Sequence, residues 1–197
     1  MLGDMDAIAG DGDHGRGMVR GSAAALDAAA LAFERGAGAG SLLAAAGDAW
    51  ADKAGGTSGV LWGAGLRAFG ERLGDAETPT PDVLAQSVRA FADRISTLGK
   101  AAIGDKTMMD ALLPFASSLE DRVLSGAAAE DAWAAAASEA TAAAASTAGL
   151  RPLKGRARPL AEKSIGTPDP GATSLAMVFA AVGPHFTAIP VPAAASN

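Results

Sequence analysis

The sequence predicts an all-α protein in which amphipathic helices pack around polar, glycine-rich loops. Only 5% of the 197 residues are aromatic, although 49% are hydrophobic, so small apolar residues supply most of the hydrophobic content. A β-sandwich needs more aromatic and β-branched residues, whereas alanine and leucine are strong helix formers. The apolar residues also lack a useful length of strand-like alternation. These observations favour closely packed helices.

The first long helix is predicted between two glycines, Gly15 before it and Gly36 after it. Its larger apolar residues, Leu26, Leu31 and Phe33, lie on one face at helical spacing. Six further helices follow in the same style, separated by glycine, proline and polar loops. The predicted ranges are Met18–Arg35, Leu42–Ala54, Val60–Leu73, Pro81–Leu98, Met108–Leu124, Ala127–Ala148 and Ala172–Val182.

Local signals support two of these helices. Thr80 is a candidate N-cap, and Pro81 suits the first turn that follows it. The range Ala127–Ala148 is almost entirely helix-forming, and Trp133 within it favours a buried helix over a disordered tail. We expect one domain that spans residues 1–197, because a chain of this length can bury a single sizeable core.

Composition excludes several classes of function. The chain has 16 basic and 22 acidic residues, so electrostatic binding to nucleic acid or to an anionic membrane is not expected. It has no cysteine, which excludes disulfides, thiolate zinc sites and cysteine nucleophiles. The longest stretch without charge, from Gly171, is broken by Gly183-Pro184, and Asp4 and Asp6 do not suit a signal peptide. We therefore expect a cytoplasmic protein.

Polar residues concentrate in four glycine-rich clusters: residues 10–15, 55–59, 104–107 and 154–171. In a bundle of antiparallel neighbours, alternate loops fall at the same end, so these clusters can converge on one rim. Glycine allows backbone N–H groups to approach an anion closely, and a helix N-terminus adds positive potential. The clusters thus predict an anion-binding rim.

Three familiar motifs fit these loops poorly. Residues 10–15 match the GxGxxG dinucleotide pattern, but no strand precedes them and their two aspartates would repel a pyrophosphate. The same loop begins like a calcium-binding loop, yet Gly15 and Ser22 stand where oxygen ligands are required. Residues 99–107 approach a P-loop, but Asp105 is inserted before Lys106 and no strand leads in. We reject all three.

A magnesium–nucleotide site fits better. Asp6, Asp11 and Asp13 are spaced i, i+5 and i+7 across a glycine-punctuated turn, with Asp6 expected in the last turn of a helix. Magnesium prefers hard oxygen ligands and is commonly shared between a few carboxylates and substrate phosphates. Carboxylates packed this closely repel one another unless a cation neutralises them. The alternative is a solvated acidic loop.

Taken together and in order, these motifs resemble the DhaL or DAK2 family, the nucleotide-binding L domains of dihydroxyacetone kinases. Each motif is modest alone, but the ordered set is specific. The matching segments are MDAIAGDGDHG at 5–15, GGTSG at 55–59, GDKTM at 104–108, KGRA at 154–157, SIG at 164–166 and DPGATS at 169–174.

The resemblance implies a closed barrel of eight antiparallel amphipathic helices with ADP or ATP bound at one rim through two magnesium ions. Family members carry more helix before the segment that matches Met5-Asp6, so the first helix is expected to be missing or truncated here, with apolar faces exposed along the seam. Asp6, Asp11 and Asp13 correspond to metal ligands. Nucleotide contacts are implied for His14, Gly15, Thr57, Ser58, Gly99, Met108, Arg156, Asp169, Pro170 and Gly171.

These implied roles are chemically reasonable. Thr57 and Ser58 offer hydroxyl and N–H donors to phosphate, and Met108 can lie against adenine. Lys106 and Arg156 are candidate catalytic cations, because positive charge stabilises a phosphoryl group in transfer. Arg158 could also steady the charge that develops on the phosphoryl group, but for Lys106 and Arg158 a solvated charge at the rim is an equal alternative.

The resemblance also implies a partner. In this family the ketone is held by a histidine of a separate DhaK-type (K) subunit or domain, so this chain is expected to bind nucleotide without completing turnover alone. Its Arg16-Gly17 form is closer to ATP-dependent triose or tetrulose kinases. Two alternatives remain: a phosphotransferase-system L subunit whose bound ADP is rephosphorylated by a DhaM-type (M) subunit, and a non-catalytic nucleotide-binding regulator. A fatty-acid kinase relative is less favoured, because His14 replaces the threonine of that family.

Overall fold

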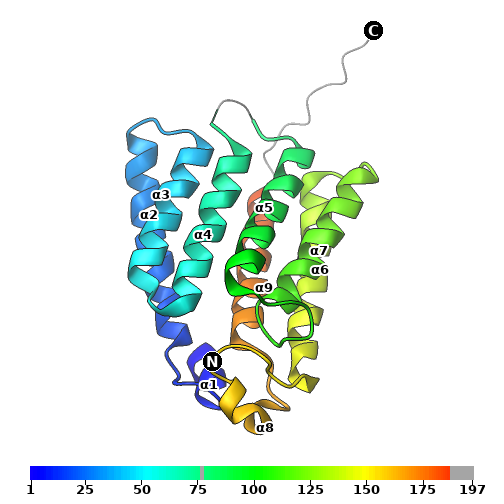
Figure 1. The fold of residues 1–197 in the computed structure, drawn as a ribbon. Helices are drawn as coiled ribbons and strands as arrows, with labels where there is room; N and C mark the ends of the chain where they lie inside the picture. The colour runs from blue at the N-terminus through cyan, green and yellow to red at the C-terminus, as the bar shows by residue number, and fades with distance from the viewer. Residues whose placement is uncertain (76–77, 187–197) are drawn as a thin grey trace.

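The computed structural model describes residues 1–75 and 78–186, and within them all regular structure is helical (Figure 1). Short 3-10 turns, labelled η, extend or connect the α-helices. The elements are α1 (Leu2–Ala7), α2 (His14–Glu34), α3 (Ala39–Ala54), α4 (Gly56–Leu73), α5 (Pro81–Gly99), α6 (Met109–Leu124), α7 (Ala129–Ser146), η1 (Thr147–Gly149), η2 (Arg158–Leu160), α8 (Ala161–Ser164), α9 (Pro170–Val182) and η3 (Gly183–Phe186).

All seven predicted helices are present, but several begin earlier than the sequence suggested. Helix α2 begins at His14 and α4 at Gly56, so each takes a glycine-rich loop into its first turn. The first turn of a helix makes few intrahelical N–H bonds, so glycine costs less there than in the interior. Thr80 is confirmed as the N-cap of α5, since its hydroxyl accepts from the Val83 N–H at 3.3 Å.

The core runs from α2–α4 through to α5, α6, α7 and α9, and its largest aromatic cluster lies between α6, α7 and α9. Phe115 stacks on Phe179 with ring centroids 3.7 Å apart, and Trp133 meets Phe115 edge-on at 4.8 Å. The indole N–H of Trp133 donates to the Phe179 carbonyl at 2.8 Å, so the ring is buried without losing its polar partner. The buried-helix prediction for the alanine-rich segment is therefore confirmed.

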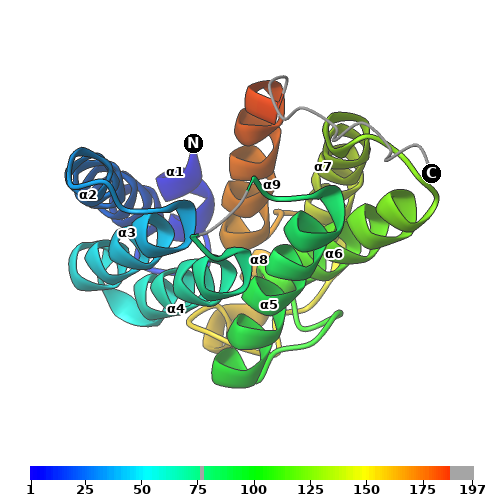
Figure 2. The same cartoon turned by 90° about the horizontal axis from the view of Figure 1, so that it is seen from above.

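Helices α2, α3 and α4 approach one another closely at glycines, and Trp50 of α3 stacks on Trp62 of α4 with ring centroids 4.9 Å apart. A Cβ at Gly47 of α3 would lie 2.6 Å from the Gly63 carbonyl of α4, and one at Gly21 of α2 would lie 2.6 Å from the Trp50 ring of α3. The three helices therefore approach one another closely, side by side in Figure 2. This packing brings the start of α2 next to the α3–α4 junction.

The large apolar residues of α2 are exposed. Leu26, Leu31 and Phe33, which the sequence assigned to one helix face, are 70%, 47% and 73% exposed, because α2 packs on α3 through smaller residues. Leu26 and Phe33, seven residues apart, do share a face, but Leu31 lies about 140° around the helix from Leu26, so its assignment to that face is wrong. Helix α2 meets α9 only slightly, and the short α1 lies against both. Among the described residues, α1 thus lies between α2 and α9, which have little direct contact with each other.

No helix in the described part of the chain combines the length and the hydropathy needed to cross a bilayer. The predicted single domain extends to Asn197, and residues 187–197 lie outside the described residues.

Candidate nucleotide and metal site

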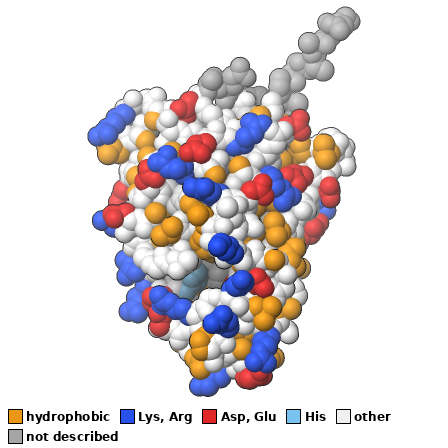
Figure 3. Space-filling model, viewed as in Figure 1, with side chains coloured by type: hydrophobic (Ala, Val, Ile, Leu, Met, Phe, Trp, Pro, Cys, Tyr) orange, Lys and Arg blue, Asp and Glu red, His pale blue; other side chains and the backbone are white. Residues whose placement is uncertain are grey.

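A cavity of about 370 Å³ opens at the end of the bundle where the glycine-rich loops meet. In Figure 3 a histidine lies in a hollow in the lower half of the molecule, and lysine and arginine side chains gather around it. All four polar clusters line this cavity, so their predicted convergence is found. The volume falls within the range of small-molecule sites. The predicted residues that line it are Asp6, Asp11, Asp13, His14, Thr57, Ser58, Gly99, Lys106, Met108, Arg156, Asp169, Pro170 and Gly171.

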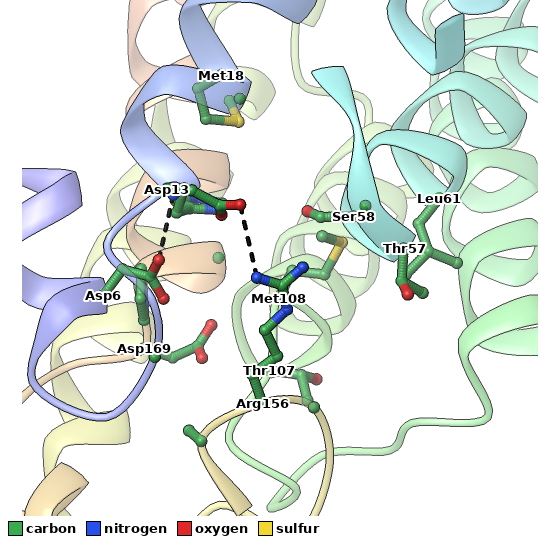
Figure 4. Close-up of a pocket in the computed structure, with 18 of the residues that line it drawn as sticks. Asp6, Asp13, Met18, Thr57, Ser58, Leu61, Thr107, Met108, Arg156 and Asp169 are labelled. Carbon is green, nitrogen blue, oxygen red and sulfur yellow. Dashed lines mark hydrogen bonds and ion pairs between the residues drawn. The ribbon is translucent and has the colours of Figure 1, made fainter. Parts of the chain in front are cut away.

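Three carboxylates come together at the mouth of this cavity. One oxygen each of Asp6, Asp11 and Asp13 lies within 4.8 Å of the others. Asp6 stands in the last turn of α1, and its Oδ2 accepts from the His14 N–H at 3.1 Å (Figure 4). Gly10 packs so closely on the Asp6 side chain that a Cβ there would collide with it. The turn is therefore shaped around these carboxylates.

The donor set suits a hard divalent cation. All three groups offer carboxylate oxygen, and neither sulfur nor imidazole nitrogen belongs to the trio. Magnesium binds such oxygens and completes its coordination with water or phosphate. The trio could therefore hold Mg²⁺ with positions left for a ligand in the cavity.

Arg156 lies beside this trio. Its guanidinium pairs with Asp11 and with Asp13, the latter at 3.5 Å, and the three side chains are between 48% and 59% exposed. Figure 4 shows Arg156 reaching across the cavity mouth from the segment that precedes α8. Exposed pairs of this kind are weak, so the guanidinium is free to exchange a carboxylate for a phosphate.

The wall opposite the trio is built from the start of α4. Gly55 and Gly56 have φ values of 78° and 64°, a left-handed conformation that glycine adopts without strain. They place Thr57 and Ser58 in the first turn of an 18-residue helix. Free N–H groups and the helix dipole make this turn suitable for phosphate.

Lys106, predicted as a catalytic cation, is 3% exposed, and its ammonium donates to two carbonyls, Leu150 at 3.1 Å and Ser164 at 2.7 Å. Burial lowers the pKa of this lysine. Asp110, also buried, accepts from the N–H groups of Gly104 and Thr107. The two side chains hold the 104–107 loop in place, so the geometry favours a positioning role for Lys106.

The remaining wall comes from the start of α9. Asp169 caps this helix by accepting from the Ala172 N–H at 2.7 Å, and burial raises its pKa to about 6. The His14 ring lies 2.9 Å from the Ser174 hydroxyl, and burial lowers the pKa of this histidine. The His14–Ser174 contact joins the N-terminal turns of α2 and α9. Gly15 does not line the cavity and instead packs against Gly3 of α1.

Apolar side chains also line the cavity. Among them are Met108, which is 7% exposed, and Leu61, about one turn beyond Ser58 on α4. Sequence reasoning missed Leu61, Met18, Asp110 and Arg20. Met18 and Leu61 resemble any helix-face residue in sequence, and Asp110 follows the recognised loop motif without belonging to it.

Fold and site together define a class, an all-helical domain that gathers groups suited to a metal-bound anionic ligand at one end. The model of the DAK2 domain family matches residues 8–183, and the chain belongs to this family. The resemblance drawn from the motifs is therefore confirmed.

The relatives include longer erythrulose kinases and separate ADP-binding DhaL subunits. The chain is 63% identical over 176 residues to a D-erythrulose kinase of Mycolicibacterium smegmatis and 56% identical over 181 residues to an L-erythrulose kinase of Pectobacterium atrosepticum. These matches cover 89% and 92% of this chain but only 30% and 31% of those kinases. The chain is also 35% identical to the ADP-binding subunit DhaL of the PEP-dependent dihydroxyacetone kinase of Escherichia coli, over 87% of this chain and 80% of that subunit.

The fold is also similar to a solved structure, the dihydroxyacetone kinase from C. freundii in complex with AMP-PNP and Mg²⁺. The TM-score is 0.64 at 30% identity, over 93% of this chain and 30% of that one. That relative binds a nucleotide analogue together with magnesium. The chain spans less than a third of the longer kinases that it matches.

Proposed function

We propose that this chain is the nucleotide-binding domain of an ATP-dependent erythrulose kinase. The observation that carries the proposal is the Asp6, Asp11 and Asp13 trio, whose oxygens lie within 4.8 Å of one another at the mouth of a cavity lined by two helix N-termini. The resemblance to two erythrulose kinases above 55% identity supports the choice of a four-carbon ketose over dihydroxyacetone.

The residues divide the work by position. Mg²⁺ held by the trio would neutralise the charge of the nucleotide phosphates. Thr57 and Ser58, with the free N–H groups of α4, would donate to those phosphates from the opposite wall. Met108 would pack against the base. Arg156 would leave the carboxylates and pair with a phosphate oxygen, and so act as the mobile cation of the site.

The ketose would be held by a partner. Since the chain spans about 30% of the erythrulose kinases that it matches, we infer that a K-type substrate-binding domain lies elsewhere in the complete enzyme. That domain would present the ketose hydroxyl to the cavity mouth. In this arrangement the present chain binds the nucleotide and contacts the charge that develops on the transferred phosphoryl group. The partner supplies the ketose that accepts the phosphoryl group.

A second candidate is an L subunit that keeps its ADP and receives phosphate from an M-type subunit. It is favoured by the resemblance to DhaL, because that match covers 80% of a subunit with a similar extent. The Arg16-Gly17 form favours ATP instead. We expect ADP to exchange freely with solution in this chain.

The deciding experiment has two stages. Calorimetric titration of the chain with ADP, in the presence and absence of Mg²⁺, should give magnesium-dependent binding. The loaded chain is then mixed with a K-type domain, ATP and either erythrulose or dihydroxyacetone. Many turnovers with erythrulose support the proposal. A single turnover that resumes only with an M-type subunit would establish the second candidate, and binding without any turnover would point to a regulator.

A further inference from the structure

The junction between α3 and α4 is unusually short. Helix α3 ends at Ala54 and α4 begins at Gly56, so Gly55 alone separates them. The left-handed conformation of Gly55 and Gly56 turns the chain back within this junction. Thr57 and Ser58 follow directly, so the direction of their donors depends on how firmly the junction is held.

One side chain from outside the junction holds it. Arg20 of α2 donates from Nε to the Lys53 carbonyl at 3.3 Å and from Nη2 to the Ala54 carbonyl at 3.1 Å. These carbonyls are in the last turn of α3, where acceptors lack an intrahelical partner. A cation at this position also complements the negative end of the helix dipole. The planar guanidinium bridges two carbonyls at once, which an ammonium cannot do with the same geometry.

The sequence of α2 makes this reach possible. Gly17 precedes Arg20 by almost one turn, and a Cβ there would lie 3.2 Å from the Ala54 carbonyl. Gly21 follows it against the Trp50 ring. Both glycines let α2 approach the end of α3, and Arg20 is the side chain that occupies the space created. Arg20 also lines the cavity, as do Thr57 and Ser58.

We propose that Arg20 is a positioning residue of the nucleotide site, which fixes the α3–α4 junction so that Thr57, Ser58 and the free N–H groups of α4 face the phosphates. The inference deepens the proposed function and rests on it for the identity of the ligand. Arg20 acts through the backbone that it bonds, and its two-point geometry, rather than its charge alone, carries the effect.

The first test needs no ligand. The Gly59 N–H donates to the Gly55 carbonyl at 3.2 Å and is the first bonded amide after the junction. In Arg20→Lys and Arg20→Gln, hydrogen exchange at this amide, followed by NMR, should be at least about fivefold faster than in the wild type. The Leu84 N–H at the start of α5 serves as the internal reference, because it bonds Thr80 far from the junction. Arg35→Gln, at the opposite end of α2, is the matched control and should leave both amides unchanged.

The second test measures Mg·ADP affinity by calorimetry on the same proteins. Both Arg20 variants should bind about tenfold more weakly, and Arg35→Gln should bind as the wild type does. If Arg20→Lys keeps wild-type exchange and wild-type affinity, charge suffices and the positioning role is overturned. If Gly59 and Leu84 exchange faster to the same extent, the effect is global and the inference also fails. A wild-type chain that does not bind Mg·ADP contradicts the proposed function instead, and the exchange test still decides the role of Arg20.

Discussion

Arg156 has two possible partners in the site, and exchanging one for the other has measurable consequences of opposite sign. In the structure its guanidinium pairs with Asp11 and Asp13, two members of the carboxylate trio. If the same side chain pairs with phosphate when nucleotide is bound, it competes with a bare metal ion and assists a metal–nucleotide complex. We therefore expect Arg156→Gln to strengthen binding of a divalent cation alone and to weaken binding of Mg·ADP.

The two effects differ in size as well as in sign. All three side chains are about half exposed, and the Arg156–Asp13 separation is 3.5 Å. At the dielectric of water, a pair at that separation is worth about 1 kcal/mol, in line with exposed ion pairs generally. Removing the competing charge should thus raise metal affinity about two- to fivefold. A lost hydrogen bond to a charged phosphate is worth about 1.5–3 kcal/mol, so Mg·ADP should bind roughly ten- to a hundredfold more weakly.

Mn²⁺ in place of Mg²⁺ makes the first titration readable by electron paramagnetic resonance, and calorimetry serves for Mg·ADP. Arg151→Gln is the matched control, because Arg151 lies on the same segment and pairs with Glu162 instead. Unchanged or weaker Mn²⁺ binding in Arg156→Gln would refute the competition. Unchanged Mg·ADP binding would refute the phosphate contact, whatever the result for the metal.

Three further outcomes follow from the geometry. Asp13→Ala should abolish magnesium-dependent ADP binding at unchanged helical content, and chelation of Mg²⁺ should lower the melting temperature of the nucleotide-loaded wild type but not of the variant. Burial raises the pKa of Asp169 from 3.8 to about 6, so the folded chain binds that proton more tightly than the unfolded chain. The free energy of unfolding should therefore fall by roughly 2–3 kcal/mol as the pH rises from about 4 to 6. Denaturant unfolding without nucleotide should show this pH dependence in the wild type and not in Asp169→Asn, which keeps a comparable N-cap. Gly21→Ala should cost about 1–3 kcal/mol through its collision with Trp50, measured by thermal unfolding with Ser22→Ala as the exposed control on the same helix.

Helix positions could be predicted from this sequence because glycine and proline separate segments of strong helix formers. The buried face of α2 could not be predicted, since Leu26 and Phe33 have the spacing of core-facing residues although both are exposed. What decides the matter is close approach: Gly21 accepts the Trp50 ring, so α2 faces α3 with its smallest residues. Hydrophobic periodicity indicates where large apolar residues lie on a helix. It does not indicate where a glycine, by having no side chain, lets two helices pack closely.

The sequence predicts some residues of the site and not others. Asp6, Asp11 and Asp13 were identifiable because their chemistry lies in the side chains and their spacing is short. Lys106 and Arg20 both act on backbone carbonyls, and nothing in a sequence marks a carbonyl that needs a donor. Such acceptors arise where helices end and loops cross, which folding alone determines. A cation in a glycine-rich loop can therefore stabilise phosphate or bridge carbonyls, and only the position of its nearest acceptors distinguishes the two.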